Sequence, residues 1–435
     1  MFVSAVDPGV YKAILRVRQA YAFDIGGMLM RFYGYMTNIG VVTMLTLAGY
    51  SFFVAGFVSS AIALAMFFVS PRISKRVDAK GQRRIVPVAA LVTLSGLAVM
   101  LVTVATHGPE WVLFVAAVLM GFLPNPQALV RARWTYLIRT GKLGEQAPEL
   151  RTMFSYEGVL DDIGFMFSPA ISIALASAIA PVAGLLAGGV GLAAGVALLT
   201  LSRSTEPQPG WKALDEEDRE RAWAANLEGE SAGVSDESAL APHQKSIIRT
   251  SPMVRVLFVL LMLVGAFFGV FDTSTVALAE QFGDPNIASV ILMATAFISM
   301  VMGFAFGMVK LRMPLWKQLV ACGLCIGTAY GTMALIDSVP SLYAVSVLGS
   351  FFYAPFLIVI NSACEASVPG ERLTEAITWI NAGATCGMAF GPSVGGLLID
   401  AVGATAGFDC GAVFAVLIPV VVLLFLRVIK RNVRG

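Results

Sequence analysis

The residues with the clearest chemical potential are charged side chains inside apolar segments. Arg31 lies in the segment FDIGGMLMRFYGYMTNIG, about 20 Å along a helix from Arg18. Asp24, Tyr35 and Asn38 share its helical face, at spacings of seven, four and three residues. A guanidinium keeps its proton under ordinary conditions, so Arg31 can attract an anionic group or tune a carboxylate but cannot shuttle protons. We predict that this face takes part in ligand binding, gating or proton coupling; the alternative is an arginine that only holds helices together.

Three carboxylates lie in the first turns of another apolar segment, SYEGVLDDIGFMFSP: Glu157, Asp161 and Asp162. A charge at the centre of a bilayer costs roughly 2.5–3.5 kcal/mol on insertion scales, so such acids need partners or a function. Asp161 or Asp162 is the expected partner of Arg31. We expect these acids near the cytoplasmic end of the N-terminal half of the chain. Further charges are predicted at that end: Asp24, Arg131 and Arg133. Paired acids would stay ionised and form part of an inside latch, whereas an unpaired acid can carry a proton; both alternatives stay open.

The second half of the chain offers a further acid, Asp272. It lies in the outer part of an apolar segment, at the position that corresponds to Thr37 in the first half. An interface acid that is capped by Thr273 or Ser274 is the alternative to a substrate-binding or proton-coupling role. Neutral polar candidates in the same half are Asn361 and Asn381.

An enzyme is not expected. The sequence shows no P-loop, metal-ligand cluster or nucleophile elbow, and without a P-loop it has no intrinsic use for ATP. Cys322 and Cys325 form a CxxC pair inside an apolar segment, where a helix contact between small residues is favoured over redox or metal chemistry. We predict no cofactor, no bound metal and no nucleic-acid partner.

The apolar segments that must position these residues are typical of a membrane protein. Hydrophobic residues form 57% of the chain and charged residues 13%, against about 25% charged residues in soluble proteins. Many apolar runs approach the ~20 residues that cross a bilayer as a helix. They predict an all-α membrane protein with twelve transmembrane helices, near 20–46, 50–70, 85–106, 110–130, 154–179, 181–202, 253–280, 286–309, 317–336, 340–362, 374–399 and 404–426.

The lysines and arginines predict the orientation. With both termini in the cytoplasm, all 30 of them except Arg31 fall in the terminal tails or in the cytoplasmic connections and their flanks, and the proposed outside loops have none. This separation predicts a multi-pass protein of the cell membrane with both termini cytoplasmic.

The two halves of the sequence resemble each other. FYGYMT in the first predicted helix parallels FFGVFD in the seventh, and GFMFSPAIS in the fifth parallels GMAFGPSVGG in the eleventh, with Pro169 and Pro392 in register. Residues 203–252 form the only long polar segment. We predict two pseudo-symmetric six-helix bundles, 1–202 and 253–435, joined by a cytoplasmic linker at 203–252; a regulatory site in the linker is the alternative.

This architecture resembles that of the major facilitator superfamily, and the connection SKRVDAKGQRR resembles the family's loop G-x-x-x-D-R-x-G-R-R. Asp78, Gly81 and Arg83 match that loop, which latches the cytoplasmic gate in the family. The sequence departs from the motif at Ser74, Ala79 and Gln82. The resemblance implies a gating role for the matching residues, with Arg131 and Arg133 beside them.

A second motif, GMAFGPSVGG, matches G-x-x-x-G-P-x-x-G-G in full. Proton-coupled drug antiporters of the superfamily carry this motif in their fifth helix, whereas here it lies in the eleventh. It predicts close helix packing at Gly387, Gly391, Pro392 and Gly395, and a bend at Pro169 in the degraded copy. The stretches VRARW, TMFSYEGVLDD and TEP also look like those of drug or metabolite exporters of an actinobacterial type.

The resemblance implies a secondary active transporter that works by alternating access. We predict proton-coupled efflux of a small amphipathic or organic molecule, by a monomer in the lipid bilayer. The alternatives are a metabolite importer or uniporter of the same fold, and a non-transporting membrane sensor or scaffold.

Overall fold

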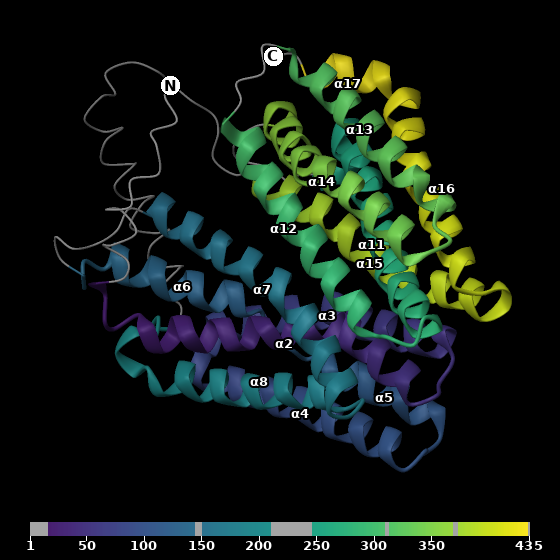
Figure 1. Ribbon diagram of the computed structural model, residues 1–435. Helices are drawn as coiled ribbons and strands as arrows, with labels where there is room; N and C mark the ends of the chain where they lie inside the picture. Colours follow the sequence, from purple (N-terminus) through teal and green to yellow (C-terminus); the bar gives the residue numbers. More distant parts are fainter. Residues whose placement is uncertain (1–15, 144–149, 210–245, 309–312, 369–372, 434–435) are drawn as a thin grey trace, which may run out of the picture.

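The computed structural model describes residues 16–143, 150–209, 246–308, 313–368 and 373–433, and its regular elements there are all helices (Figure 1). The helices of the first half are α2 (Tyr21–Leu47), α3 (Phe52–Lys80), α4 (Gln82–Ala105), α5 (Glu110–Met120), α6 (Pro126–Arg139), α7 (Leu150–Ala178) and α8 (Ala183–Leu201). Those of the second half are α10 (Ile247–Thr250), α11 (Pro252–Gln281), α12 (Asn286–Met308), α13 (Leu315–Gly331), α14 (Val339–Ser367), α15 (Leu373–Val402), α16 (Ala404–Leu424) and α17 (Leu426–Asn432). Two short 3₁₀ turns, η2 (Arg203–Thr205) and η3 (Thr332–Leu335), follow α8 and α13.

The predicted all-α membrane fold is confirmed, and each predicted span has its counterpart in this order of helices. In the described part of the chain, nine helices are long and apolar enough to cross a membrane. The three remaining spans are α2, α7 and the α5–α6 pair, which contain intramembrane charges or a break. The spans that depart most from a simple apolar helix are therefore those that hold the first-half site candidates.

The fourth span differs from its prediction, because it is not one helix over 110–130. The chain leaves the helix after Met120 and begins α6 at Pro126. Pro124 and Pro126 have no N–H to continue a helical ladder, and the Asn125 side chain caps α6 by accepting a hydrogen bond from the Ala128 N–H at 3.1 Å. The helix then runs on to Arg139, so residues that the sequence placed at the end of a span lie within α6.

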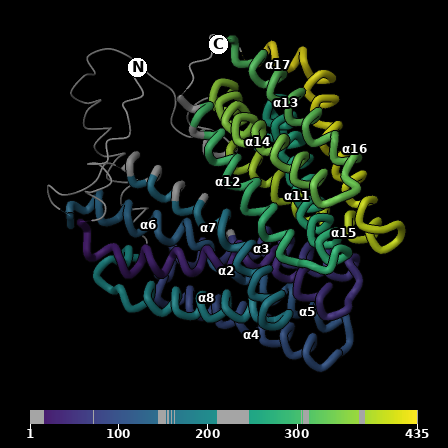
Figure 2. Tube along the Cα trace, viewed as in Figure 1, coloured from purple at the N-terminus to yellow at the C-terminus, as the bar shows by residue number. Residues whose placement is uncertain are grey.

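The two halves have separate hydrophobic cores. One core joins residues between Val17 and Leu199, and the other joins residues between Ile247 and Val433. Figures 1 and 2 show the two bundles meeting at one end and diverging toward the end where α17 lies. We call these the closed end and the open end.

The predicted packing residues of the eleventh span line a close contact between α15 and its neighbours. A Cβ atom on Gly387 would lie against backbone atoms of Met262 and Ala266 in α11. A Cβ on Gly391 would meet the Ala266 carbonyl oxygen and would lie 2.9 Å from the Cα of Gly269. Pro392 lies within the helix and contacts Gly269 on one side and Gly56 of α3 on the other, while Gly395 faces Val270. Pro169 lies inside α7.

Gly391→Ala is expected to lower the thermal unfolding temperature of the purified protein. The added methyl group would press on the α11 backbone, and overpacking of this kind costs about 1–3 kcal/mol. Gly191→Ala in α8 is the matched control, because its Cβ would meet only the Leu29 carbonyl oxygen at 3.7 Å. Equal unfolding temperatures for the two variants would contradict this account of the packing.

Candidate functional site

A buried ion pair connects α2 to α7. The Nη2 of Arg31 donates to Oε2 of Glu157, and the two side chains are 2% and 0% exposed. The Nε of the same guanidinium lies 3.3 Å from Oδ1 of Asp161, one turn further along α7. One cation therefore faces two carboxylates of the neighbouring helix, which is the partner helix that the sequence predicted for Arg31.

Three further polar side chains extend this pair into a network. Tyr35 donates to Oδ1 of Asp161 at 3.4 Å, and Gln127 donates to the Tyr35 hydroxyl at 3.0 Å. Arg131 lies 3.5 Å from Oδ2 of Asp161 and is 42% exposed. We call the whole set the Arg31 cluster; its members are Arg31, Tyr35, Gln127, Arg131, Glu157 and Asp161.

The Arg31 cluster contains two guanidinium groups and two carboxylates, so its formal charge is zero when both acids are ionised. Burying a charge without a partner costs several kcal/mol, and mutual pairing offsets that cost. Within the described residues, Oε1 of Glu157 is buried and has no hydrogen-bond partner. One carboxylate oxygen of the cluster is therefore available to accept a proton or a hydrogen bond.

The other described residues predicted around Arg31 form their hydrogen bonds outside this network. Asp24 is nearly buried and accepts a hydrogen bond from the indole N–H of Trp134 at 2.9 Å. Asn38 accepts from the Ser59 hydroxyl at 2.8 Å and so faces α3. Asp162 belongs to α7, and its side chain is outside the described set.

Arg133 has a different environment from the one predicted, because it is fully buried within the first half. Its Nη1 donates to the Ser202 carbonyl and the Thr205 hydroxyl, and its Nη2 to the Leu199 carbonyl, each at 2.8 Å. Its Nε donates to Oε1 of Gln82 at 2.7 Å. The last carbonyls of a helix have no intrahelical partner and carry partial negative charge. Arg133 therefore caps α8 and joins it to α4 and α6.

The predicted gating loop is a one-residue break between two helices. Asp78 is exposed on α3, and Arg83 lies in the first turn of α4. Gly81 alone separates α3 from α4, with φ at +89°, a conformation that favours glycine. The Arg83 N–H donates to Oε1 of Glu206 at 2.8 Å, which ties this junction to the segment after α8.

The second-half candidates are dispersed. Asn361 in α14 and Asn381 in α15 are exposed, and the Asn361 amide donates to its own helix, to the Leu357 carbonyl at 3.0 Å. Asp272 is partly exposed on α11. The hydroxyls of Thr273 and Ser274 donate to backbone carbonyls one turn earlier in α11, so they do not provide the predicted cap.

An apolar seal joins the two halves near the closed end. Its members are Ile39 of α2, Ile173 of α7, Val276 and Ala279 of α11, and Ala288 of α12. Polar contacts flank the seal: Thr46 donates to Glu280, and the hydroxyls of Ser60 and Ser393 lie 2.6 Å apart. Both connect a first-half helix to a second-half helix.

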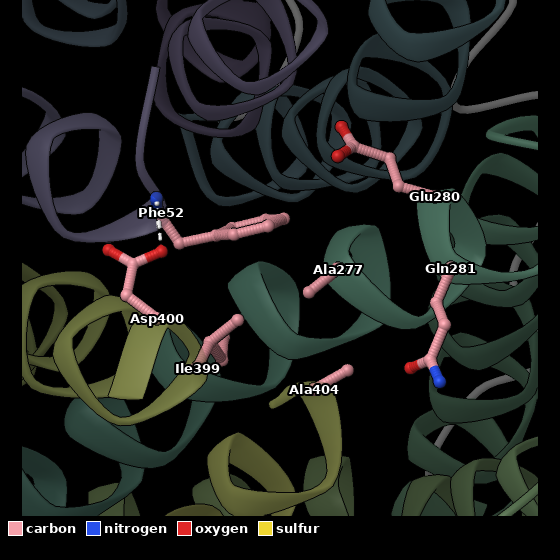
Figure 3. A pocket seen from close by; sticks show the side chains of 7 residues that line it. All are labelled: Phe52, Ala277, Glu280, Gln281, Ile399, Asp400 and Ala404. Atoms are coloured by element: carbon pink, nitrogen blue, oxygen red, sulfur yellow. Dashed lines mark hydrogen bonds between the residues drawn. The ribbon is translucent and has the colours of Figure 1, made fainter. Parts of the chain in front are cut away.

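The carboxylate of Asp400 forms the most specific contact between the halves. Located near the end of α15, it accepts hydrogen bonds from the N–H groups of Phe52 and Phe53 at 2.9 and 2.6 Å. These N–H groups open α3, where a helix carries partial positive charge. Figure 3 shows Asp400 and Phe52 at the edge of an open pocket of about 360 Å³. The pocket is lined by Phe52, Ala277, Glu280, Gln281, Ile399, Asp400 and Ala404.

Asp400→Asn is expected to open the closed end more often. The variant keeps the shape of the side chain but loses its charge, and a charge at a helix N-terminus contributes about 0.3–1 kcal/mol. Distances between spin labels at positions 111 and 402, in a variant without other cysteines, would show a larger population of long separations. Asp337→Asn, in an exposed position before α14, is the matched control. An unchanged distance distribution in Asp400→Asn would argue against a latch.

Comparison with known proteins places these features in context. The family profile described as Major Facilitator Superfamily matches residues 25–344 and 325–434. A search of curated proteins finds no match. Among solved structures, the nucleoside transporter NupG is similar with a TM-score of 0.67 and 14% identity, covering 95% of this chain and 100% of the other.

Two other solved structures have the same architecture. The peptide transporter POT in complex with sulfate has a TM-score of 0.68 at 14% identity, with 96% of each chain covered. A bacterial homologue of the iron transporter ferroportin, in an inward-facing state, has a TM-score of 0.66 at 14% identity, covering 94% of this chain and 99% of the other. At these identities, the similarity shows the fold alone.

Proposed function

The chain belongs to the Major Facilitator Superfamily, and from this premise we propose that it is a proton-coupled exporter of a small amphipathic organic molecule. Its fold is that of a secondary transporter. The observation that carries the finer proposal is the Arg31 cluster, in which one buried guanidinium is shared by two carboxylates from another helix.

The arrangement of the halves supports alternating access. The seal and its flanking contacts close one end, while the bundles diverge at the other (Figure 2). The distribution of lysines and arginines favours a cytoplasmic location for the open end and both termini. In this proposal the protein is a monomer of the cell membrane in its inward-open conformation. The bundles 1–202 and 253–435 rock about the central site and are joined by the linker 203–252.

The chemistry of the Arg31 cluster favours protons as the coupling ion. An arginine does not release its proton at ordinary pH and a tyrosine does so only near pH 10, so the carboxylates are the groups that can exchange one. Oε1 of Glu157 can accept a proton while Arg31 stays paired with Asp161. Protonation would change the formal charge of the cluster from zero to +1. The strength of the ion pairing between α2 and α7 would then depend on the proton concentration on the side of the membrane to which the cluster is open.

Transport into proteoliposomes tests this proposal. Purified protein would be reconstituted, and a panel of amphipathic cations, anions and neutral molecules would be offered with and without an imposed pH gradient. We expect the gradient to drive accumulation of at least one panel member by wild type, and to drive none by Glu157→Gln. Accumulation that is equal with and without the gradient would exclude proton coupling and would leave a uniporter.

A further inference from the structure

Asp272 lies one helical turn from the apolar seal, on its open side. Val276 belongs to the seal and contacts residues of the first half. Asp272 precedes Val276 by four residues, so it lies on the same face of α11, about 6 Å closer to the open end. Asp272 is partly exposed, whereas its neighbours Phe271 and Thr273 are buried. Asp272 therefore lies on the face of α11 that is turned toward the first half.

Aromatic rings lie at a similar distance from the seal in both halves. Phe268, one turn further from the seal than Asp272, has its ring centroid 4.5 Å from that of Tyr353 in α14, and both residues are partly exposed. On the first-half wall, Tyr35 lies one turn from Ile39 of the seal, and its ring meets Phe165 edge-on at 5.8 Å. An acid and rings from both halves thus lie within about two helical turns of the seal, on its open side.

The charges of the two walls do not balance. The Arg31 cluster is formally neutral, because the buried Glu157 and the partly exposed Asp161 are balanced by Arg31 and Arg131. Asp272 lies on the opposite wall, and among the described residues it forms no ion pair. The Arg31 cluster and Asp272 together therefore have a formal charge of −1 when their acids are ionised. A charge that is partly removed from water is stabilised by an opposite charge, and none of the ion pairs within the described chain supplies one to Asp272.

We propose that Asp272 binds the positively charged group of an amphipathic organic cation, and that the rings of Phe268 and Tyr353 hold its apolar part. Aromatic faces attract cations and bury apolar surface, so an acid beside such rings favours cationic ligands over neutral or anionic ones. The inference rests on the proposed transport function and names its substrate class. It also replaces the prediction that Arg31 attracts an anionic substrate, because the Arg31 guanidinium is buried against its two acids.

Equilibrium binding to the full-length protein in detergent tests the inference without requiring transport. The probes are tetraphenylphosphonium and tetraphenylborate, which have nearly the same size and shape but opposite charge. Binding would be measured for wild type, for Asp272→Asn and for Asp409→Asn. Asp409 is an exposed acid of α16 and serves as the matched control. Thermal unfolding would establish that the three proteins are equally folded, and Phe268→Leu would test the aromatic contribution separately.

Wild type and Asp409→Asn are expected to bind the phosphonium at least ~10-fold more tightly than Asp272→Asn does, which corresponds to about 1.4 kcal/mol. Wild type and Asp409→Asn should both bind tetraphenylborate more weakly than tetraphenylphosphonium. Equal binding of the phosphonium by wild type and Asp272→Asn would overturn the inference, as would a wild type that binds both ions equally or neither. Binding that depends on Asp272, combined with no transport under any gradient, would support the inference and reject the proposed function.

Discussion

Replacing Arg31 by alanine is expected to abolish transport, with a loss of at least ~100-fold, while the protein still reaches the membrane. The variant leaves Glu157 and Asp161 next to each other without the cation that they share. Breaking a buried ion pair by removing one partner costs about 3–5 kcal/mol. In the proposed function it also removes the group that couples α2 to the protonation of α7. Initial rates in proteoliposomes at several pH values would measure the effect.

Two companion variants separate function from folding. Arg31→Lys keeps the charge but loses the planar fork that serves two acids at once, so partial rescue is expected. Arg31→Ala combined with Glu157→Gln removes one cation and one anion, so it should recover thermal stability relative to Arg31→Ala without recovering transport. A stable Arg31→Ala protein that transports normally at every pH would refute the proposed role. A double variant that regains full transport would show that the ion pair has only a structural role.

Replacing Arg133 by alanine is expected to cause the largest loss of stability, roughly 3 kcal/mol or more. The two carbonyls, one hydroxyl and one amide oxygen that Arg133 satisfies would lose a charged donor inside the first half. Buried acceptors left without a partner cost about 1–3 kcal/mol each, before relaxation. The readouts are the thermal unfolding temperature in detergent and the yield of folded protein.

Arg131→Ala is the matched control, because Arg131 lies two residues away in the same helix with a side chain that is 42% exposed. Its free energy of unfolding should be within about 0.5 kcal/mol of wild type, as is usual for exposed positions. Its transport rate should fall instead, because Asp161 loses one of its two cations. If Arg131→Ala and Arg133→Ala destabilised the protein equally, the assignment of Arg133 as the cap of α8 would be wrong.

The sequence predicted the helices better than it predicted which side chains meet. Apolar length and the separation of charged loops were sufficient for twelve spans, because both follow from the cost of burying backbone and charge in a bilayer. The partner helix of Arg31 was also predictable, since few acids lie inside apolar segments. Asp161 was among the predicted partners and lies beside Arg31. The pairing with Glu157 was not predicted, because it depends on the rotation and depth of α7 against α2, which the sequence pattern does not determine.

The pair Arg131 and Arg133 shows a second limit. The sequence pattern ended the fourth span at residue 130, so both arginines were assigned to one charged mouth. In the structure the helix continues to Arg139, and residues two apart on a helix point to opposite sides. One arginine therefore faces Asp161 and the other caps α8. Gln127 and Trp134 were missed for the same reason, since their roles depend on a helix that restarts at Pro126.

The Asp400 contact has a consequence for how this protein tolerates mutation over evolutionary time. Its donors are the main-chain N–H groups of residues 52 and 53, which every amino acid except proline provides. Drift at these two positions therefore leaves one side of the connection unchanged, and only the acid on α15 must be kept. A connection of this kind needs no compensating pair of substitutions, so it can persist while the side chains at positions 52 and 53 change.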